Sequence, residues 1–434
     1  MKDKSPDTEL ALLQSIFSAA ATQTTAQNGN LRFLEQALKK HWGLGQNIIL
    51  CWAPTAAGIE LLVVPHYFLA NFSASLDDED VEGSLTEANG RFIRNLISNR
   101  RVMAEDEFTA AANRLKISKT VIKLPIPLID DPYVTDQIDD MVKRHSISFV
   151  QKRAVLLFDI VDFALYTAFE QTSQLTSLSY SLNSAYNKML KKNIDIDFAR
   201  SSTGDGFYVW SRGAGAQNGM HLYQFMLLVV ADNAIAKRKS RGNTVPIIRT
   251  GFHAGSHYAF FQAEGINPTM YSYIVGEVTI ELARMLDMAQ PGQIFVGDFT
   301  IEIPTSSREG AYLIDVDAQK FIERAGKSLA DLKGVELSDE EIVSIHSYLT
   351  GETGASAGQV LRRFKITDKH GSSRYAYNLR SNIHIKNKKP VILGLQDYYL
   401  PRRSRSAGDH LAATRAKTTM YERKRVVPGI TEES

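Results

Sequence analysis

The 434-residue sequence lacks the features that mark secreted, disulfide-stabilised and membrane-spanning proteins. It contains a single cysteine, Cys51, which excludes a disulfide framework within the chain. The opening residues, MKDKSPDTEL, are charged and polar, unlike a secretory signal. The most apolar stretch, FMLLVVA at 225–231, is far shorter than the roughly 20 residues that span a bilayer. These absences predict a soluble, cytoplasmic protein without a membrane span.

The sequence also lacks internal repeats and a strong net charge. Its formal charge is +2, and its length allows two or three domains of ordinary size. Charge is uneven near the C-terminal end, where residues 386–425 contain 11 Lys or Arg against three acidic residues. Residues 401–434 are therefore either a solvated, disordered basic tail or a contact for nucleic acid, anionic lipid or a partner. We favour the tail and expect no nucleic-acid partner, because neither interleaved aromatic residues nor zinc-ligand spacing accompanies the charge.

Residues 1–130 are predicted to form an N-terminal α+β module, to which we assign a regulatory role. The expected elements are a helix over 8–40 with a break at QNGN, a β-hairpin over 47–65, an acidic loop over 75–84 and a helix over roughly 86–116. The prolines of LPIPLIDDP interrupt the pattern near residue 130 and end the module.

A connecting helix is expected over 131–151. Val134, Ile138 and Met141 recur at helical spacing and share one face. That face suits pairing with a second copy of the chain or packing on its own domain, and the sequence leaves both alternatives open.

From residue 152 the pattern alternates between strands and helices, which predicts a mixed sheet with covering helices and an α+β fold class. Strands are expected at AVLLFDI, GFYVW, PIIRTGFHAG and PGQIFVG, with HYAFFQ as a hairpin partner, and helices at 164–190, 221–236 and 278–289. We assign 152–300 to a catalytic domain and 301–400 to a C-terminal α+β extension. In that extension, LRRFKITDKHGSSRYAYNLRSNIHI predicts two strands around a DKHG turn.

Two aspartates stand out because of their apolar surroundings. Asp159 ends the strand in LLFDIVDF, and Asp205 lies in the TGDG turn that precedes GFYVW. On adjacent antiparallel strands both carboxylates can face one spot, where hard oxygen ligands suit two Mg²⁺ or Mn²⁺ ions. The backbone of IVDF, up to Phe163, can offer N–H groups to phosphate. Two aspartates alone are a weak signal, since GDG can be a simple turn and Asp159 can cap the next helix.

Four separated blocks make the sequence resemble the class III nucleotidyl cyclases. These blocks are LLFDIVDF, SSTGDGFYVW, IIRTGFHAG and YIVGEVTIELARMLDMAQPGQIFVG, and they cover about 152–300. The resemblance implies a metal-dependent enzyme that cyclises a nucleoside triphosphate, with two catalytic domains paired head to tail as a homodimer. It implies that Asp159, Asp205 and the carbonyl of Ile160 bind two divalent cations, and that Arg284 of the opposite subunit stabilises the transition state.

The sequence departs from this family at three positions. Ile280 occupies the place of an asparagine that orients the ribose, which indicates slower chemistry or a degenerate domain that only binds nucleotide. Ser201 and Tyr273 occupy the base-reading positions and match neither the adenine nor the guanine pattern. A bulky Tyr273 favours a smaller pyrimidine base, so this chain resembles the bacterial anti-phage cyclases that make cyclic CMP or cyclic UMP.

We therefore expect a pyrimidine cyclase acting on UTP or CTP, with substrate bound by Ser201, Tyr273 and Phe163. The alternatives are an adenylate cyclase that makes cyclic AMP and a catalytically degenerate nucleotide-binding sensor. The sequence identifies neither the activating signal nor the receptor of the product.

Overall fold

The computed structural model divides the chain into two compact units, which are described separately here. Unit 1 comprises Met1–Val150 and Tyr258–Ile274, and unit 2 comprises Gln151–His257 and Val275–Ser434. The structure describes residues 27–400 except 75–81, 99, 195, 214, 265–268, 308–309, 338, 354–358, 368–370 and 398–399. The predicted basic tail over 401–434 lies outside the described residues.

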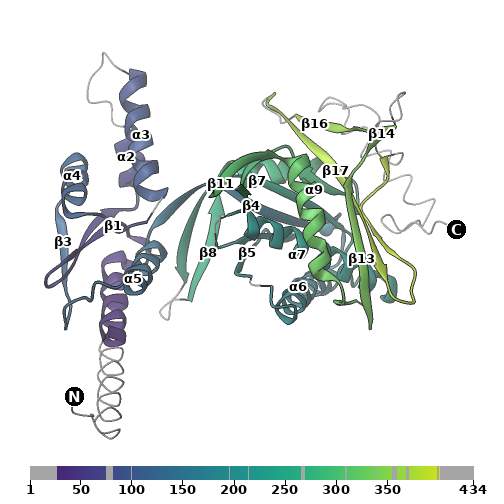
Figure 1. Ribbon diagram of the computed structural model, residues 1–434, viewed down its shortest axis with the longest axis horizontal. Helices are drawn as coiled ribbons and strands as arrows, with labels where there is room; N and C mark the ends of the chain where they lie inside the picture. Colours follow the sequence, from purple (N-terminus) through teal and green to yellow (C-terminus); the bar gives the residue numbers. More distant parts are fainter. Residues whose placement is uncertain are drawn as a thin grey trace, which may run out of the picture. The chain divides into compact units, whose positions relative to one another are not determined.

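Unit 1 contains a small antiparallel sheet between helices (Figure 1). The strand order is β1-β2-β3, and β1 and β2 form the predicted hairpin. Its elements are a helix over 27–42, η1 (Gly43–Gly45), β1 (Asn47–Thr55), β2 (Gly58–Pro65), α2 (Phe68–Ala74), α3 (Glu82–Ser98), α4 (Glu105–Leu115), β3 (Lys119–Lys123) and α5 (Pro132–Arg144). Strand β1 is buried on both faces, because α3 and α4 pack on one face while the 27–42 helix and α5 pack on the other.

Helix α5 settles the alternative left open for its apolar face. Val134, Ile138 and Val142 are buried in the same cluster as Ile49 of β1. Met141 is partly buried against that cluster. The face therefore packs within unit 1, and the helix belongs to its core.

Three expectations for unit 1 need correction. The predicted helix over 86–116 is two helices, α3 and α4, because Arg101 between them points inward and is fully buried. The QNGN segment is helical rather than a break, although residues 8–26 of that predicted helix lie outside the described residues. Most of the predicted acidic loop is also outside them, and its last residues, from Glu82, already belong to α3.

Unit 2 is organised around a large mixed sheet, which confirms the predicted α+β class. The strand order is β12-β13-β17-β9-β7-β4-β6-β5, and β7 and β9 are parallel whereas β4 and β6 are antiparallel. The first elements are β4 (Ile147–Ile160), η2 (Phe163–Leu165), α6 (Ala168–Lys191), β5 (Phe198–Ser202), β6 (Gly206–Ser211), α7 (Ala216–Lys239), β7 (Ile248–Glu264), β8 (Thr269–Val275), α8 (Glu277–Met288) and β9 (Ile294–Gly297). Three of these strands cross the division of the chain, since β4 up to Val150, β7 from Tyr258 and β8 up to Ile274 belong to unit 1.

The chain after residue 300 extends this same sheet, since β17 pairs with β9. Its elements are β10 (Thr300–Ser307), β11 (Gly310–Asp317), α9 (Ala318–Ser328), η3 (Leu329–Leu332), β12 (Glu336–Leu337), β13 (Glu340–Leu349), β14 (Gly351–Thr353), β15 (Gln359–Leu361), β16 (Arg363–Thr367), β17 (Ser373–Ile385) and β18 (Val391–Leu393). Strands β16 and β17 are the two predicted around DKHG. Strands from residues 301–400 therefore belong to the same sheet as β9. The predicted domain boundary at residue 301 stays a prediction.

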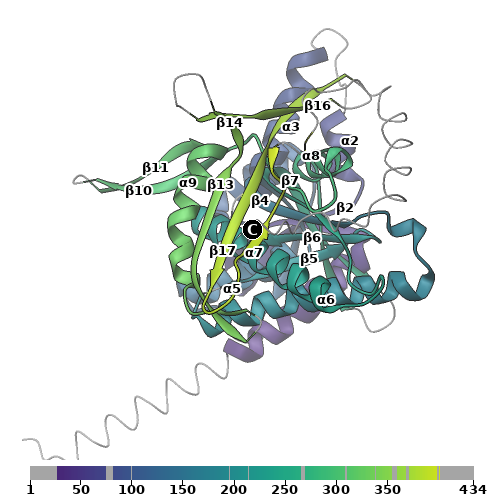
Figure 2. The same cartoon turned by 90° about the vertical axis from the view of Figure 1, so that its right-hand side faces the viewer.

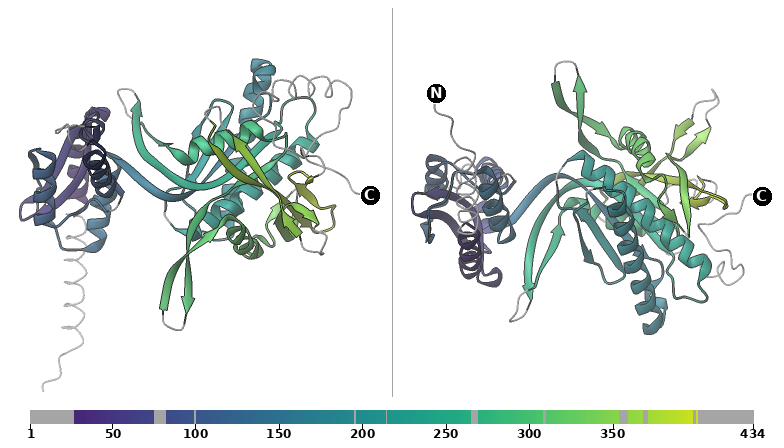
Figure 3. Two further views of the ribbon diagram at one scale, coloured as in Figure 1. Left: turned by 90° about the horizontal axis from the view of Figure 1, so that it is seen from above. Right: turned by 60° about the horizontal axis from the view of Figure 1, so that its bottom comes forward.

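The two faces of the unit 2 sheet carry different side chains. Alternate residues of β4 enter the main core with α6, α7 and α9, and these are Ala154, Leu156, Phe158 and Ile160. The helices α6 and α7 pack side by side in this layer (Figure 3). Asp159 has the opposite parity and therefore points to the other face, the one that α8 covers.

Helix α8 approaches β7 closely because two positions there are glycine. A Cβ on Gly251 would lie 2.9 Å from a methyl group of Leu282, and one on Gly255 would lie 3.2 Å from Val278. The prediction that HYAFFQ is the hairpin partner of PIIRTGFHAG is wrong. HYAFFQ continues the same strand, β7, and the strand that pairs with its end is β8. Within the described part of the chain, no helix is long and apolar enough to cross a membrane.

Candidate active site

The two predicted aspartates meet at the end of β4. Asp159 lies opposite Gly206 in the β4–β6 register, and the N–H of Ile160 donates to the carbonyl of Asp205 at 2.9 Å. Gly206 makes this close approach possible, because a Cβ there would lie 2.0 Å from the carbonyl oxygen of Phe158. The structure therefore brings Asp159, Ile160 and Asp205 together in one corner.

Arg249 on β7 is a site residue that the sequence reasoning missed. Its Nε donates to Oδ2 of Asp159 at 2.8 Å, and its Nη2 contacts the same oxygen. This leaves Oδ1 of Asp159 without a hydrogen-bond partner among the described residues. The only sequence signal was a lone arginine inside the apolar strand PIIRTGFHAG. Arg249 thus fixes one oxygen of Asp159, while the other oxygen is left without a hydrogen bond from the described residues.

The charge at this corner is not balanced by Arg249 alone. Burial raises the pKa of Asp159, Arg249 opposes that shift, and the carboxylates of Asp205 and Asp287 add to it. The net shift is upward. The pKa of Asp159 thus stays raised although Arg249 is beside it, and a further cation would stabilise the ionised carboxylate.

The backbone after Asp159 offers fewer donors than IVDF suggested. The N–H groups of Ile160 and Val161 already donate to carbonyls of Asp205 and Ile247. The predicted contact with phosphate is thereby limited to the N–H groups of Asp162 and Phe163, and it stays a prediction. Asp162 has a left-handed backbone with φ 55°. That conformation lets the chain turn sharply from β4 into η2.

Asp159 does not cap the helix that follows it. Thr167 is the N-cap of α6 and forms a capping box with Glu170. The capping alternative is thereby excluded, and the N-terminus of α6 is already satisfied within the chain. Asp159 is left to the sheet face that it shares with Arg249.

Ser201 lies on the same sheet face, directly opposite Tyr208 of the neighbouring strand. The Tyr208 hydroxyl donates to the carbonyl of Thr279 on α8 at 2.9 Å. Burial raises the pKa of Tyr208 to about 12, with contributions from Asp159 and Asp287. Tyr208 was not predicted from the sequence, and it ties the floor of the site to α8.

Tyr273, the other predicted base-reading residue, belongs to unit 1. Its ring stacks on Phe260 of β7, with centroids 5.8 Å apart and planes at 23°. Ser201 belongs to unit 2. Their joint role in binding a base stays a prediction.

Arg284 lies on the outer face of α8. Its side chain is 39% exposed and pairs with Asp287 at 3.5 Å. Ile280, one turn earlier, is 56% exposed, so this apolar residue has no role in the core of the chain. Arg284 also lines a cavity of about 360 Å³ between α8 and the β16–β17 hairpin. The proposed catalytic arginine is thus accessible to a partner molecule.

Among the described residues, no group of three or more His, Cys, Asp or Glu side chains is placed to hold a metal ion. Asp159, Asp205 and a backbone carbonyl form a smaller set of hard oxygen donors. Mg²⁺ is typically held by one or two carboxylates, water and the phosphates of a substrate, rather than by a complete protein cage. The donor set therefore fits a divalent cation whose remaining ligands are water or phosphate oxygens.

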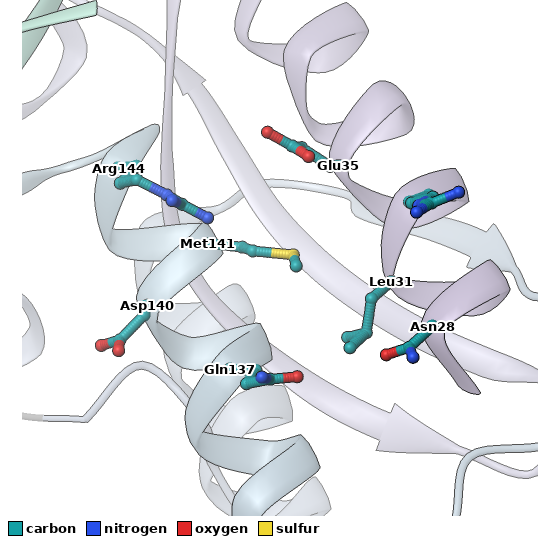
Figure 4. A pocket seen from close by; sticks show the side chains of 8 residues that line it. Asn28, Leu31, Glu35, Gln137, Asp140, Met141 and Arg144 are labelled. Carbon is teal, nitrogen blue, oxygen red and sulfur yellow. The ribbon is translucent and has the colours of Figure 1, made fainter. Parts of the chain in front are cut away.

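A second pocket lies in unit 1, between the 27–42 helix and α5 (Figure 4). Its walls carry Glu35 and Asp140 as well as Arg32 and Arg144, with Leu31 and Met141 between them. It contains none of the predicted site residues. The mixed charges of this pocket do not favour one class of ligand.

Comparisons with known proteins find a weak similarity in fold to solved structures and no similarity in sequence to a protein family. No protein-family model and no curated protein matches the chain. The solved structures that resemble it include three cyclases. The first is the adenylyl cyclase CyaB from P. aeruginosa, with a TM-score of 0.31 and 12% sequence identity over 56% of this chain and 97% of that one. The second is the guanylate cyclase domain of RhGC from Catenaria anguillulae in complex with GTP, with a TM-score of 0.31 and 10% identity over 55% of this chain and 100% of that one. The third is the guanylyl cyclase Cya2, with a TM-score of 0.29 and 13% identity over 53% of this chain and 91% of that one. At these scores the similarity does not by itself determine what this chain does.

Proposed function

We propose that the protein is a metal-dependent nucleotidyl cyclase, which converts a nucleoside triphosphate into a 3′,5′-cyclic nucleotide and pyrophosphate. One observation carries the proposal. The oxygen Oδ1 of Asp159 has no hydrogen-bond partner among the described residues, in a corner that also contains Asp205, on a sheet face covered by the helix of Arg284. The four sequence blocks described above support the same chemistry.

In this reaction the ribose 3′-oxygen attacks the α-phosphorus, loses its proton and displaces pyrophosphate. Divalent cations, Mg²⁺ or Mn²⁺, supply positive charge to the phosphate oxygens when bound. Asp159, Asp205 and the carbonyl of Ile160 would hold these cations, and Arg249 fixes the orientation of Asp159. Arg284 opposes the negative charge that develops on the phosphates, which a guanidinium fork is suited to do.

We assign the substrate to the pyrimidine nucleotides UTP or CTP, and the biological role to anti-phage signalling. Ser201 can donate and accept a hydrogen bond to a base edge, while Tyr273 adds bulk that shortens a pocket. Phe163 contributes its backbone N–H to a phosphate. An adenylate cyclase that makes cyclic AMP is the competing assignment.

A second candidate function is a degenerate nucleotide-binding sensor. It is favoured by Ile280, which is exposed on α8 where the related cyclases carry an asparagine. An isoleucine cannot hydrogen-bond a ribose. Such a protein binds nucleotide without forming a cyclic product.

The test is an incubation of the purified chain with ATP, GTP, CTP and UTP at equal concentration and Mn²⁺, with products identified by mass. We expect cyclic UMP or cyclic CMP to dominate by about 5- to 150-fold, the effect of one mispaired polar group in a closed pocket. Tyr273→Ala should narrow that preference. Dominant cyclic AMP contradicts the pyrimidine assignment, and bound nucleotide without any cyclic product supports the sensor.

The homodimer with composite sites has its own test. Asp159→Ala and Arg284→Ala chains are each expected to be inactive. In a mixed dimer, one site then carries both defects and the other neither, so mixing should restore part of the activity. Absence of recovery after proven subunit exchange contradicts a shared site.

A further inference from the structure

We propose that Arg374, in the C-terminal extension, is a positioning residue for α8 that keeps the carboxylate of Glu281 occupied, so that Arg284 does not pair with Glu281. This inference rests on the proposed function of Arg284. It begins with a bridge between the extension and α8, which lie side by side in unit 2 (Figure 2).

Arg374 joins two carboxylates that lie one turn apart on α8. Its Nη1 contacts Oε1 of Glu281, and its Nη2 contacts Oε1 of Glu277 at 3.5 Å. Two terminal nitrogens of one planar guanidinium thus hold both ends of the first turn of α8. A lysine has one ammonium group and cannot reproduce this fork.

Glu281 is the central member of this bridge. Its side chain is 11% exposed, and its other oxygen, Oε2, contacts Nε2 of His253 on β7. His253 itself is buried and requires Gly297, because a Cβ there would lie 2.1 Å from Nδ1 of the imidazole. Both oxygens of Glu281 are therefore held by fixed partners from two strands.

The bridge matters because Glu281 lies three residues before Arg284 on the same helix. Residues at that spacing are neighbours on a helix surface and attract each other when oppositely charged. Arg284 and Glu281 also line the same cavity, together with Arg374 and Tyr375 of the extension. Without Arg374, the carboxylate of Glu281 would be free to pair with Arg284 and to hold its guanidinium away from phosphate.

The experiment compares Arg374→Ala with a matched control, Arg363→Ala. Arg363 lies on the partner strand of the same hairpin, is 50% exposed against 45% for Arg374, and pairs with Asp298 rather than α8. We expect Arg374→Ala to lower kcat about tenfold with little change in KM, because phosphate charge is stabilised less in the transition state. Arg363→Ala should leave both constants near the wild-type values.

The decisive variant is the double substitution Arg374→Ala with Glu281→Gln. It removes the charge that captures Arg284, so it should recover most of the kcat lost in Arg374→Ala. Arg374→Lys should recover only part. A structural role alone predicts that the double variant is as impaired as Arg374→Ala or worse, and that result would overturn the proposal.

Amide hydrogen exchange gives a readout that does not depend on catalysis. Exchange in 277–288 should be faster in Arg374→Ala than in Arg363→Ala, since the bridge to the first turn of α8 is lost. Equal exchange in both variants contradicts the bridge. If the proposed function is wrong, the wild type forms no cyclic product. Faster exchange of 277–288 in Arg374→Ala than in Arg363→Ala would then still support the positioning of α8 by Arg374.

Discussion

Two aspartates, one in each unit, are held in opposite ways. Asp139 on α5 is 2% exposed and accepts hydrogen bonds from the N–H groups of Arg101 and Val102, at 2.5 and 2.9 Å, and from the Trp52 indole at 3.3 Å. Lys143 adds a cation at 2.8 Å. Asp159 has Arg249 on one oxygen and, among the described residues, no partner on the other. A carboxylate filled by fixed donors holds a fold together, whereas one with an open oxygen beside a second carboxylate is suited to bind a cation.

The largest expected effect is on catalysis. Asp159→Asn keeps the shape of the side chain and an acceptor for Arg249, but removes the charge that holds a cation. We expect the rate of cyclic product formation to fall about 1000-fold, with the fold retained. Initial rates and denaturant unfolding measure the two quantities.

The control for this variant is Asp197→Asn, since Asp197 pairs with Arg212 at the surface and is 64% exposed. It should not change the rate. A rate for Asp159→Asn close to that of this control would remove Asp159 from the metal assignment.

The reverse pattern is expected for Asp139→Asn. It keeps an acceptor for the buried N–H groups but removes the negative charge that faces Arg101 and Lys143, so unfolding should become easier by about 3 kcal/mol. Turnover per folded molecule should not change. Denaturant titration checks the first expectation, with Asp140→Asn as the control because Asp140 lies next along α5 and is 76% exposed. Equal stability of the two variants would break the comparison.

A third prediction concerns His257, a buried group that stays neutral. Burial lowers its pKa to about 3, with Arg153 adding to the shift. As the pH falls, His257 is protonated in the unfolded chain before it is protonated in the folded one. The stability that the neutral His257 contributes is therefore complete above pH 6.5 and is lost as the pH falls toward 3. The slope reaches at most about 1.4 kcal/mol per pH unit.

Urea unfolding between pH 7 and pH 5 measures that slope. His257→Gln, which cannot be protonated in this range, should flatten it. An unchanged slope in the variant would show that other groups control the response to acid. Asp159 acts in the opposite sense, because its raised pKa means that protonation favours the folded state.

The smallest effect is expected at the surface of unit 1. Arg100 pairs with Asp136, and their side chains are 55% and 63% exposed. Arg100→Ala should change the free energy of unfolding by about 0.5 kcal/mol or less, because solvent screens exposed ion pairs. A loss of unfolding free energy in Arg100→Ala as large as that in Asp139→Asn would contradict the view that a buried aspartate contributes more to stability than an exposed ion pair.

Local patterns in the sequence predicted the elements whose partners are near in the chain. The 47–65 hairpin follows from two apolar runs and a turn, and α6 follows from its helical periodicity. The gap between α3 and α4 was missed, since it depends on Arg101 turning toward Asp139, 38 residues later. The continuation of β7 was missed because Gly255, which resembles a turn residue, instead makes room for Val278 of α8.

The same distinction applies to the site. The meeting of Asp159 and Asp205 could be inferred because their strands are neighbours and pair directly. The Asp159–Arg249 pair could not, because these residues are 90 positions apart and nothing local in PIIRTGFHAG identifies a partner. The different surroundings of Ile280 and Glu281 on α8, one exposed and the other paired with Arg374, also required the fold.

The most direct test of the central claim is a Mn²⁺ titration followed by electron paramagnetic resonance, with and without UTP. If the open oxygen of Asp159 binds a cation together with Asp205, the wild type should take up Mn²⁺ with nucleotide present, and Asp159→Asn should weaken this binding about tenfold or more. Asp139→Asn should bind Mn²⁺ as the wild type does wherever it remains folded. Equal Mn²⁺ affinity in the wild type and Asp159→Asn would contradict the account.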